Sequence, residues 1–139
     1  MKATGLTRKG NSPEQRIELL RGGYRAQLNR YLQLETLADE EHDLLRSRNG
    51  IQRVSEILQA KRELLDEIRS VDEGLATDRA WWVSARRDLP AASGGELMQI
   101  LEAVSVTVER ILALEAACRD LLACSLDWKR TETTEDIVS

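Results

Sequence analysis

The sequence contains little of what metal proteins and most enzymes need. It has one histidine, His42, and two cysteines among its 139 residues. A carboxylate-bridged metal site on helices needs two histidine motifs and further inward carboxylates, so Asp39 with His42 is not sufficient. The sequence also lacks a glycine-rich phosphate loop, a Cys-x-x-Cys motif and a nucleophile with a histidine placed to activate it. We therefore expect no metal, no cofactor and no enzymatic activity.

The two cysteines, Cys118 and Cys124, fall in one predicted helix. Their spacing along a helix separates the Cα atoms by roughly 9 Å, which is beyond the reach of a disulfide. Buried, reduced thiols are therefore predicted, and a cytoplasmic protein is consistent with them. Residues 1–11 hold basic side chains without an apolar run behind them, so neither a signal peptide nor a membrane anchor is expected.

Proline and aromatic residues are also rare. The chain has two prolines and no phenylalanine, whereas charged residues make up 32% of it. Such a composition is typical of helical bundles and coiled coils. The net charge is −4 and basic residues alternate with acidic ones, which argues against a nucleic-acid partner. Charges within every long apolar stretch argue against a membrane span.

The predicted fold is all-α, a long antiparallel helical hairpin plus a third long helix in one elongated domain. We expect the helices at about 12–48, 51–89 and 94–129. Residues 1–11 are expected to be disordered. Residues 130–139 are polar and acidic without periodicity, and a disordered tail is predicted there.

Capping and turn residues set these boundaries. Ser12–Gln15 is typical of a helix start, and Ser93–Glu96 is interpreted as a second capping box, with serine and glutamate three positions apart. Gly22–Gly23 weakens the first turns. Asn49–Gly50 ends the first helix and connects it to the second as a hairpin, while Leu89–Pro90 ends the second.

The second helix carries an apolar stripe with a seven-residue period. It predicts a helix that packs on two neighbours, with Leu65 facing both. The apolar residues assigned to the stripe are Ile51, Val54, Ile57, Leu58, Leu64, Leu65, Ile68, Val71, Leu75 and Trp82, and the polar residues Lys61 and Asp72 occupy two further seam positions.

The third helix has more apolar residues than one buried stripe requires. About two thirds of residues 97–126 are apolar. This excess favours either burial between both other helices or a face reserved for another chain. Trp128 follows the apolar run and is interpreted as an exposed anchor. The candidate partner-binding residues are Leu97, Leu101, Val104, Val108, Ile111, Leu114 and Trp128.

Part of the chain, about residues 28–79, resembles the FlgN family of flagellar type III export chaperones. The resemblance lies in Glu40–Leu45, in the turn Arg48–Gly50 and in the following helix with Lys61 before Leu64–Leu65. Arg79 falls near a basic position typical of that family.

The resemblance implies a cytoplasmic chaperone that binds the amphipathic helical ends of hook-associated flagellar proteins before export. It also implies a contact with the export gate through a carboxyl-terminal aromatic residue, for which Trp128 is the candidate here. Such a chaperone is expected to be a monomer or a weak homodimer. The alternative is a structural or adaptor coiled-coil component of a secretion or other multiprotein assembly, whose third helix pairs with its own copy.

Overall fold

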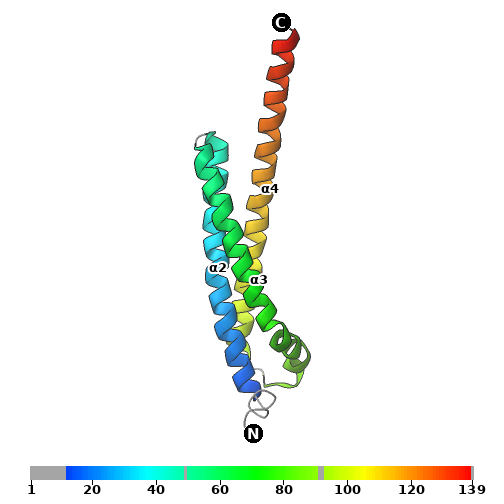
Figure 1. Ribbon diagram of the computed structural model, residues 1–139. Helices are drawn as coiled ribbons and strands as arrows, with labels where there is room; N and C mark the ends of the chain where they lie inside the picture. Colours follow the sequence, from blue (N-terminus) through cyan, green and yellow to red (C-terminus); the bar gives the residue numbers. More distant parts are fainter. Residues whose placement is uncertain (1–11, 49, 91–92, 139) are drawn as a thin grey trace.

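The chain folds into three long helices, as the computed structural model shows (Figure 1). The structure describes residues 12–48, 50–90 and 93–138, the side chains of residue 51 and of residues 125–138 excepted. The all-α prediction is confirmed. The elements are α2 (Pro13–Ser47), α3 (Ile51–Ala85), the short 3-10 helix η1 (Arg86–Asp88) and α4 (Gly95–Val138).

Helix α2 begins with the predicted capping box. The backbone N–H of Gln15 donates to Ser12 Oγ at 3.2 Å, and the N–H of Ser12 donates to Gln15 Oε1 at 2.9 Å. These bonds satisfy two donors that the first turn leaves free. The helix continues through Gly22 and Gly23 without a break. A Cβ on Gly23 would lie 2.8 Å from Leu75 Cδ2, so this glycine allows α3 to approach closely.

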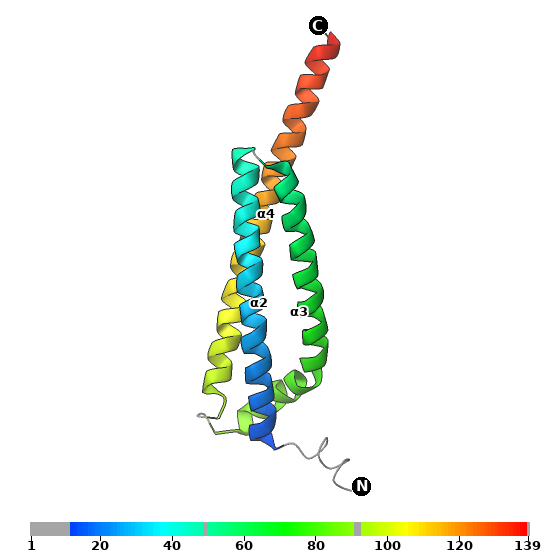
Figure 2. The same cartoon turned by 60° about the vertical axis from the view of Figure 1, so that its left-hand side comes forward.

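Helices α2 and α3 form the predicted antiparallel hairpin (Figures 1 and 2). Arg48 and Gly50 adopt left-handed conformations with φ of 59° and 71°. Asn49, which was predicted to share this role, lies outside the described residues. Along the hairpin, Gln27 Nε2 donates to the carbonyl oxygen of Ile68 at 2.9 Å.

The other boundaries differ from the predicted ones. Helix α3 ends at Ala85 and η1 follows, because Leu89 must be extended (φ −94°, ψ 152°) before Pro90. Helix α4 continues to Val138, through the segment after residue 129 where the sequence predicts a disordered tail. Residues 1–11, also predicted to be disordered, lie outside the described residues.

Helix α2 lies between its two neighbours. It packs against both α3 and α4, whereas among the described residues no Cα atom of α3 lies within 8 Å of one in α4. Two buried clusters hold the three helices together. The members of the first are Ile17, Leu20, Tyr24, Trp82, Leu97 and Ile100, and those of the second are Leu34, Ile68 and Ile111.

The stripe on α3 is narrower than predicted. Ile57 and Ile68 are buried and Leu64 is partly buried, but Leu58 and Leu65 are 44% and 43% exposed. The prediction that Leu65 faces both other helices is therefore wrong. The buried face of α3 is centred about 60° around the helix from Leu65, where Lys61, also assigned to a seam position, is buried.

Candidate partner-binding surface

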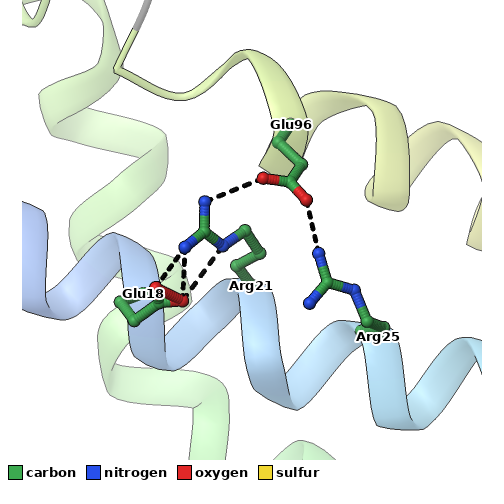
Figure 3. A network of polar contacts seen from close by, with 4 residues as sticks. All are labelled: Glu18, Arg21, Arg25 and Glu96. Carbon is green, nitrogen blue, oxygen red and sulfur yellow. Dashed lines mark hydrogen bonds and ion pairs between the residues drawn. The ribbon is translucent and has the colours of Figure 1, made fainter.

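An ion network fixes the start of α4 against α2 (Figure 3). Glu96, in the first turn of α4, accepts hydrogen bonds from Arg21, at 2.8 Å, and from Arg25. Arg21 also donates from Nε to Glu18 at 3.0 Å. Arg21 is 32% exposed and the other three side chains are at least half exposed, so water screens each pair and its contribution to stability is small. The network mainly sets the register in which the two parallel helices meet.

Beyond this network, a groove follows the junction of α2 and α4. It consists of two hollows, of 460 and 590 Å³, which share Leu32 and Arg110. Their lining residues from α2 are Leu28, Leu32, Glu35, Thr36 and Asp39, and those from α4 are Gln99, Glu102, Ala103, Val106, Thr107, Arg110, Ala113 and Leu114. We call this surface the α2/α4 groove.

The α2/α4 groove combines apolar side chains with charges, and one ion pair crosses it where the two hollows meet. Leu32 and Val106 keep 40% and 42% of their surface exposed. Arg110 crosses the junction and donates from Nε and Nη2 to the carboxylate of Glu35, at 2.9 and 3.2 Å. Asp39 and Glu102, which are both exposed, line opposite ends of the groove. Contiguous apolar surface open to water is a feature of sites that bind other chains, and Leu32 and Val106 line the same hollow.

The predicted partner-binding residues do not form one surface. Leu97 and Ile111 are buried in the two core clusters, at 1% and 6% exposure. Leu101 and Val104 are partly buried and pack against the first cluster. Leu97 and Ile111 therefore lie in the core, as the alternative of burial between the helices requires. Their contact with a partner stays a prediction.

The remaining predicted residues lie elsewhere. Val108 is half-buried. Leu114 is half-buried as well, and it is the predicted residue that lines the α2/α4 groove. Helix α4 reaches the position of Trp128, but the side chain of Trp128 lies outside the described ones.

Sequence reasoning missed the exposed apolar residues of α4. Val106 and Leu112 are 42% and 62% exposed, and Met98 is 44% exposed. They lie on other sides of α4 than the predicted partner-binding residues. Apolar residues occupy every side of α4, so the period of the sequence alone could not have found them.

A buried ion network joins all three helices. Lys61 on α3 contacts Glu41 on α2, at 2.6 Å from Nζ to Oε1, and Glu115 on α4. The side chains of Lys61 and Glu41 are only 7% and 4% exposed. Burial by itself lowers the pKa of Lys61, but the bonds to both carboxylates outweigh it and raise the pKa above its usual value. Lys61 is therefore held in its charged form.

His42 lies beside one carboxylate. Its Nδ1 lies 3.9 Å from the carboxylate of Asp43, and its side chain is 25% exposed. Within the described residues, no group of three or more histidine, cysteine or acidic side chains is arranged to hold a metal ion. None of the helices in the described part of the chain is long and apolar enough to cross a membrane.

Comparison with known proteins does not assign the chain to a family. The α2/α4 groove and the ion network of Lys61 therefore have to be interpreted from their own geometry. No family model, no curated protein and no solved structure matches this chain.

Proposed function

We propose that this protein is a cytoplasmic export chaperone of the FlgN type, which binds the amphipathic helical ends of hook-associated flagellar proteins. The observation that supports the proposal is the α2/α4 groove, where Leu32 and Val106 remain open to water beside a helix rich in apolar residues. The proposal also uses the resemblance of Glu40–Leu45 and the following turn and helix to that family.

The mechanism follows from apolar burial. A client protein that has not yet assembled exposes the apolar face of its terminal helix. Such a helix can lie in a groove between two parallel helices, which then cover its apolar face. Burial of apolar surface contributes about 25 cal/mol per Å² before the costs of association are subtracted. A groove that combines apolar side chains with charges gives moderate affinity, which suits a chaperone that must release its client.

A second candidate function has its own supporting observation. Helix α4 extends to Val138, past the hairpin turn that connects α2 and α3 (Figures 1 and 2). A projecting helix without neighbours is only marginally stable in water. A structural or adaptor component, in which this segment pairs with another copy, would supply the missing neighbour.

The test measures binding of a peptide that corresponds to the terminal amphipathic helix of a hook-associated protein. Val106→Asp should weaken binding about tenfold or more, because the new charge must be desolvated inside the contact. Val83→Asp is the matched control, since Val83 is 58% exposed and lies on α3 away from the groove. Circular dichroism should show both variants folded.

Two results would contradict the proposal. One is equal binding by both variants. The other is absence of peptide binding together with a tight, concentration-independent oligomer, which would favour the structural or adaptor function.

A further inference from the structure

The α2/α4 groove selects its occupant by charge as well as by apolar contact. Its lining contains three carboxylates, Glu35, Asp39 and Glu102, and one cation, Arg110. Arg110 is already paired with Glu35 at 2.9 Å. No ion pair is found for Asp39 or Glu102 among the described residues. The groove therefore presents two carboxylates that a ligand can reach.

The positions of these carboxylates define the geometry of a complementary ligand. Glu102 lies on α4 at one end of the groove, and Asp39 lies on α2 at the other end, opposite Ala113 and Leu114. Along the axis of α4, the two carboxylates are separated by roughly three helical turns, or about 17 Å. A helix lying along the groove would meet Glu102 on one border of its apolar stripe and Asp39 on the other.

The charged residues near the start of α4 do not change the excess of negative charge in the α2/α4 groove. Arg21 and Arg25 both donate to Glu96, and Arg21 also contacts Glu18, so two cations and two anions neutralise one another there (Figure 3). A ligand at this end meets no excess of positive charge from the network.

We propose that the α2/α4 groove binds an amphipathic helix with basic residues on both borders of its apolar stripe. The helix needs about three turns in contact and two lysines or arginines roughly 10 or 12 positions apart, one for Glu102 and one for Asp39, because about 11 positions would return to the same border of the stripe. Its apolar stripe packs on Leu32 and Val106. The inference rests on the proposed function, because it names the chemistry of the client that this chaperone accepts.

The experiment compares two synthetic amphipathic peptides that share one stripe of leucine and alanine. In one peptide the two border positions are lysine, and in the other they are glutamate. The lysine peptide should bind the native chain about tenfold more tightly, because each exposed ion pair changes affinity a few-fold and two attractions become two repulsions. The preference should shrink at high salt.

Charge reversal in the protein separates local recognition from net charge. The variant Asp39→Lys/Glu102→Lys should prefer the glutamate peptide. The control Glu67→Lys/Glu73→Lys changes the net charge equally, at two exposed positions on α3 that do not line the groove, and should keep the native preference. The inference is overturned if the native chain binds both peptides equally tightly, or if the control variant prefers the glutamate peptide.

Further outcomes distinguish this inference from the proposed function. If the hook-associated helix binds and neither synthetic peptide does, the inference is wrong and the chaperone function stands. If the lysine peptide binds and the hook-associated helix does not, the charge selection stands and the client class is wrong. If the native chain dimerises and Val106→Asp makes it monomeric, the occupant is a second copy and the inference is overturned.

Discussion

Replacing Lys61 with methionine should destabilise the protein strongly. Methionine fills a similar volume but leaves Glu41, whose side chain is 4% exposed, without its counter-charge. Glu115 is 33% exposed and can turn towards water, so the penalty comes mainly from Glu41. Breaking a buried pair by removing one partner costs about 3 to 5 kcal/mol. A domain of this size has only about 5 to 15 kcal/mol of stability.

The loss should depend on pH in a defined direction. In the native protein the pKa of Lys61 is raised, because both carboxylates favour the ammonium form. The contribution of Lys61 is therefore fully present below the usual lysine pKa and is lost as the pH rises through the raised value.

Urea unfolding followed by far-UV circular dichroism measures both effects. Arg62→Met is the matched control, since Arg62 is the exposed next residue on the same helix and should change the free energy of unfolding by less than about 0.5 kcal/mol. Replacing Lys61, Glu41 and Glu115 together with apolar residues should restore much of the stability. A loss below about 1 kcal/mol for Lys61→Met near neutral pH, or a loss that does not shrink as the pH rises past the usual lysine pKa, would refute the reasoning.

Two further predictions concern α4. Gly94→Ala should lower the free energy of unfolding by about 1 to 3 kcal/mol, because the new Cβ would overlap the ring of Trp82. Gly95→Ala is the control, since its Cβ meets open space and the change should be neutral or stabilising. Equal effects of the two substitutions in urea unfolding would contradict the close contact between Gly94 and Trp82. Burial, together with the nearby Glu41 and Glu115, raises the pKa of Cys118 to about 11, although Lys61 acts in the opposite direction. A thiol reagent near pH 8 should therefore label the exposed Cys124 in the folded protein and reach Cys118 only after unfolding. Rapid labelling of Cys118 in the folded protein would contradict its buried position.

Local signals predicted the fold well because capping and turn chemistry act over a few residues. Ser12 with Gln15, and the break around Gly50, gave the helix start and the hairpin. The buried face of α3 was harder, because leucines occupy both sides of that helix. Period alone therefore could not separate Ile68, which is buried, from Leu65, which is exposed.

The candidate site was less predictable because it depends on how two distant helices meet. Arg110 and Glu35 are separated by 75 positions, and nothing in either local sequence indicates that they pair. The network of Lys61 was missed for the same reason, since a lysine in an apolar stripe is recognisable only as an irregularity until Glu41 and Glu115 are seen around it. The prediction of reduced thiols placed Cys118 correctly in the interior, whereas Cys124 is exposed.

The central position of α2 has a consequence for the order of folding. Its contacts with α3 begin across a short turn, as in the pair of Arg53 and Glu40, which are 13 positions apart. Its contacts with α4 close loops of about 75 residues. Loop closure is slower and entropically more costly for the second set. On the ribosome the hairpin can therefore form while α4 is still being synthesised, and during that interval Leu20 and Leu34 of the nascent chain lack their final cover.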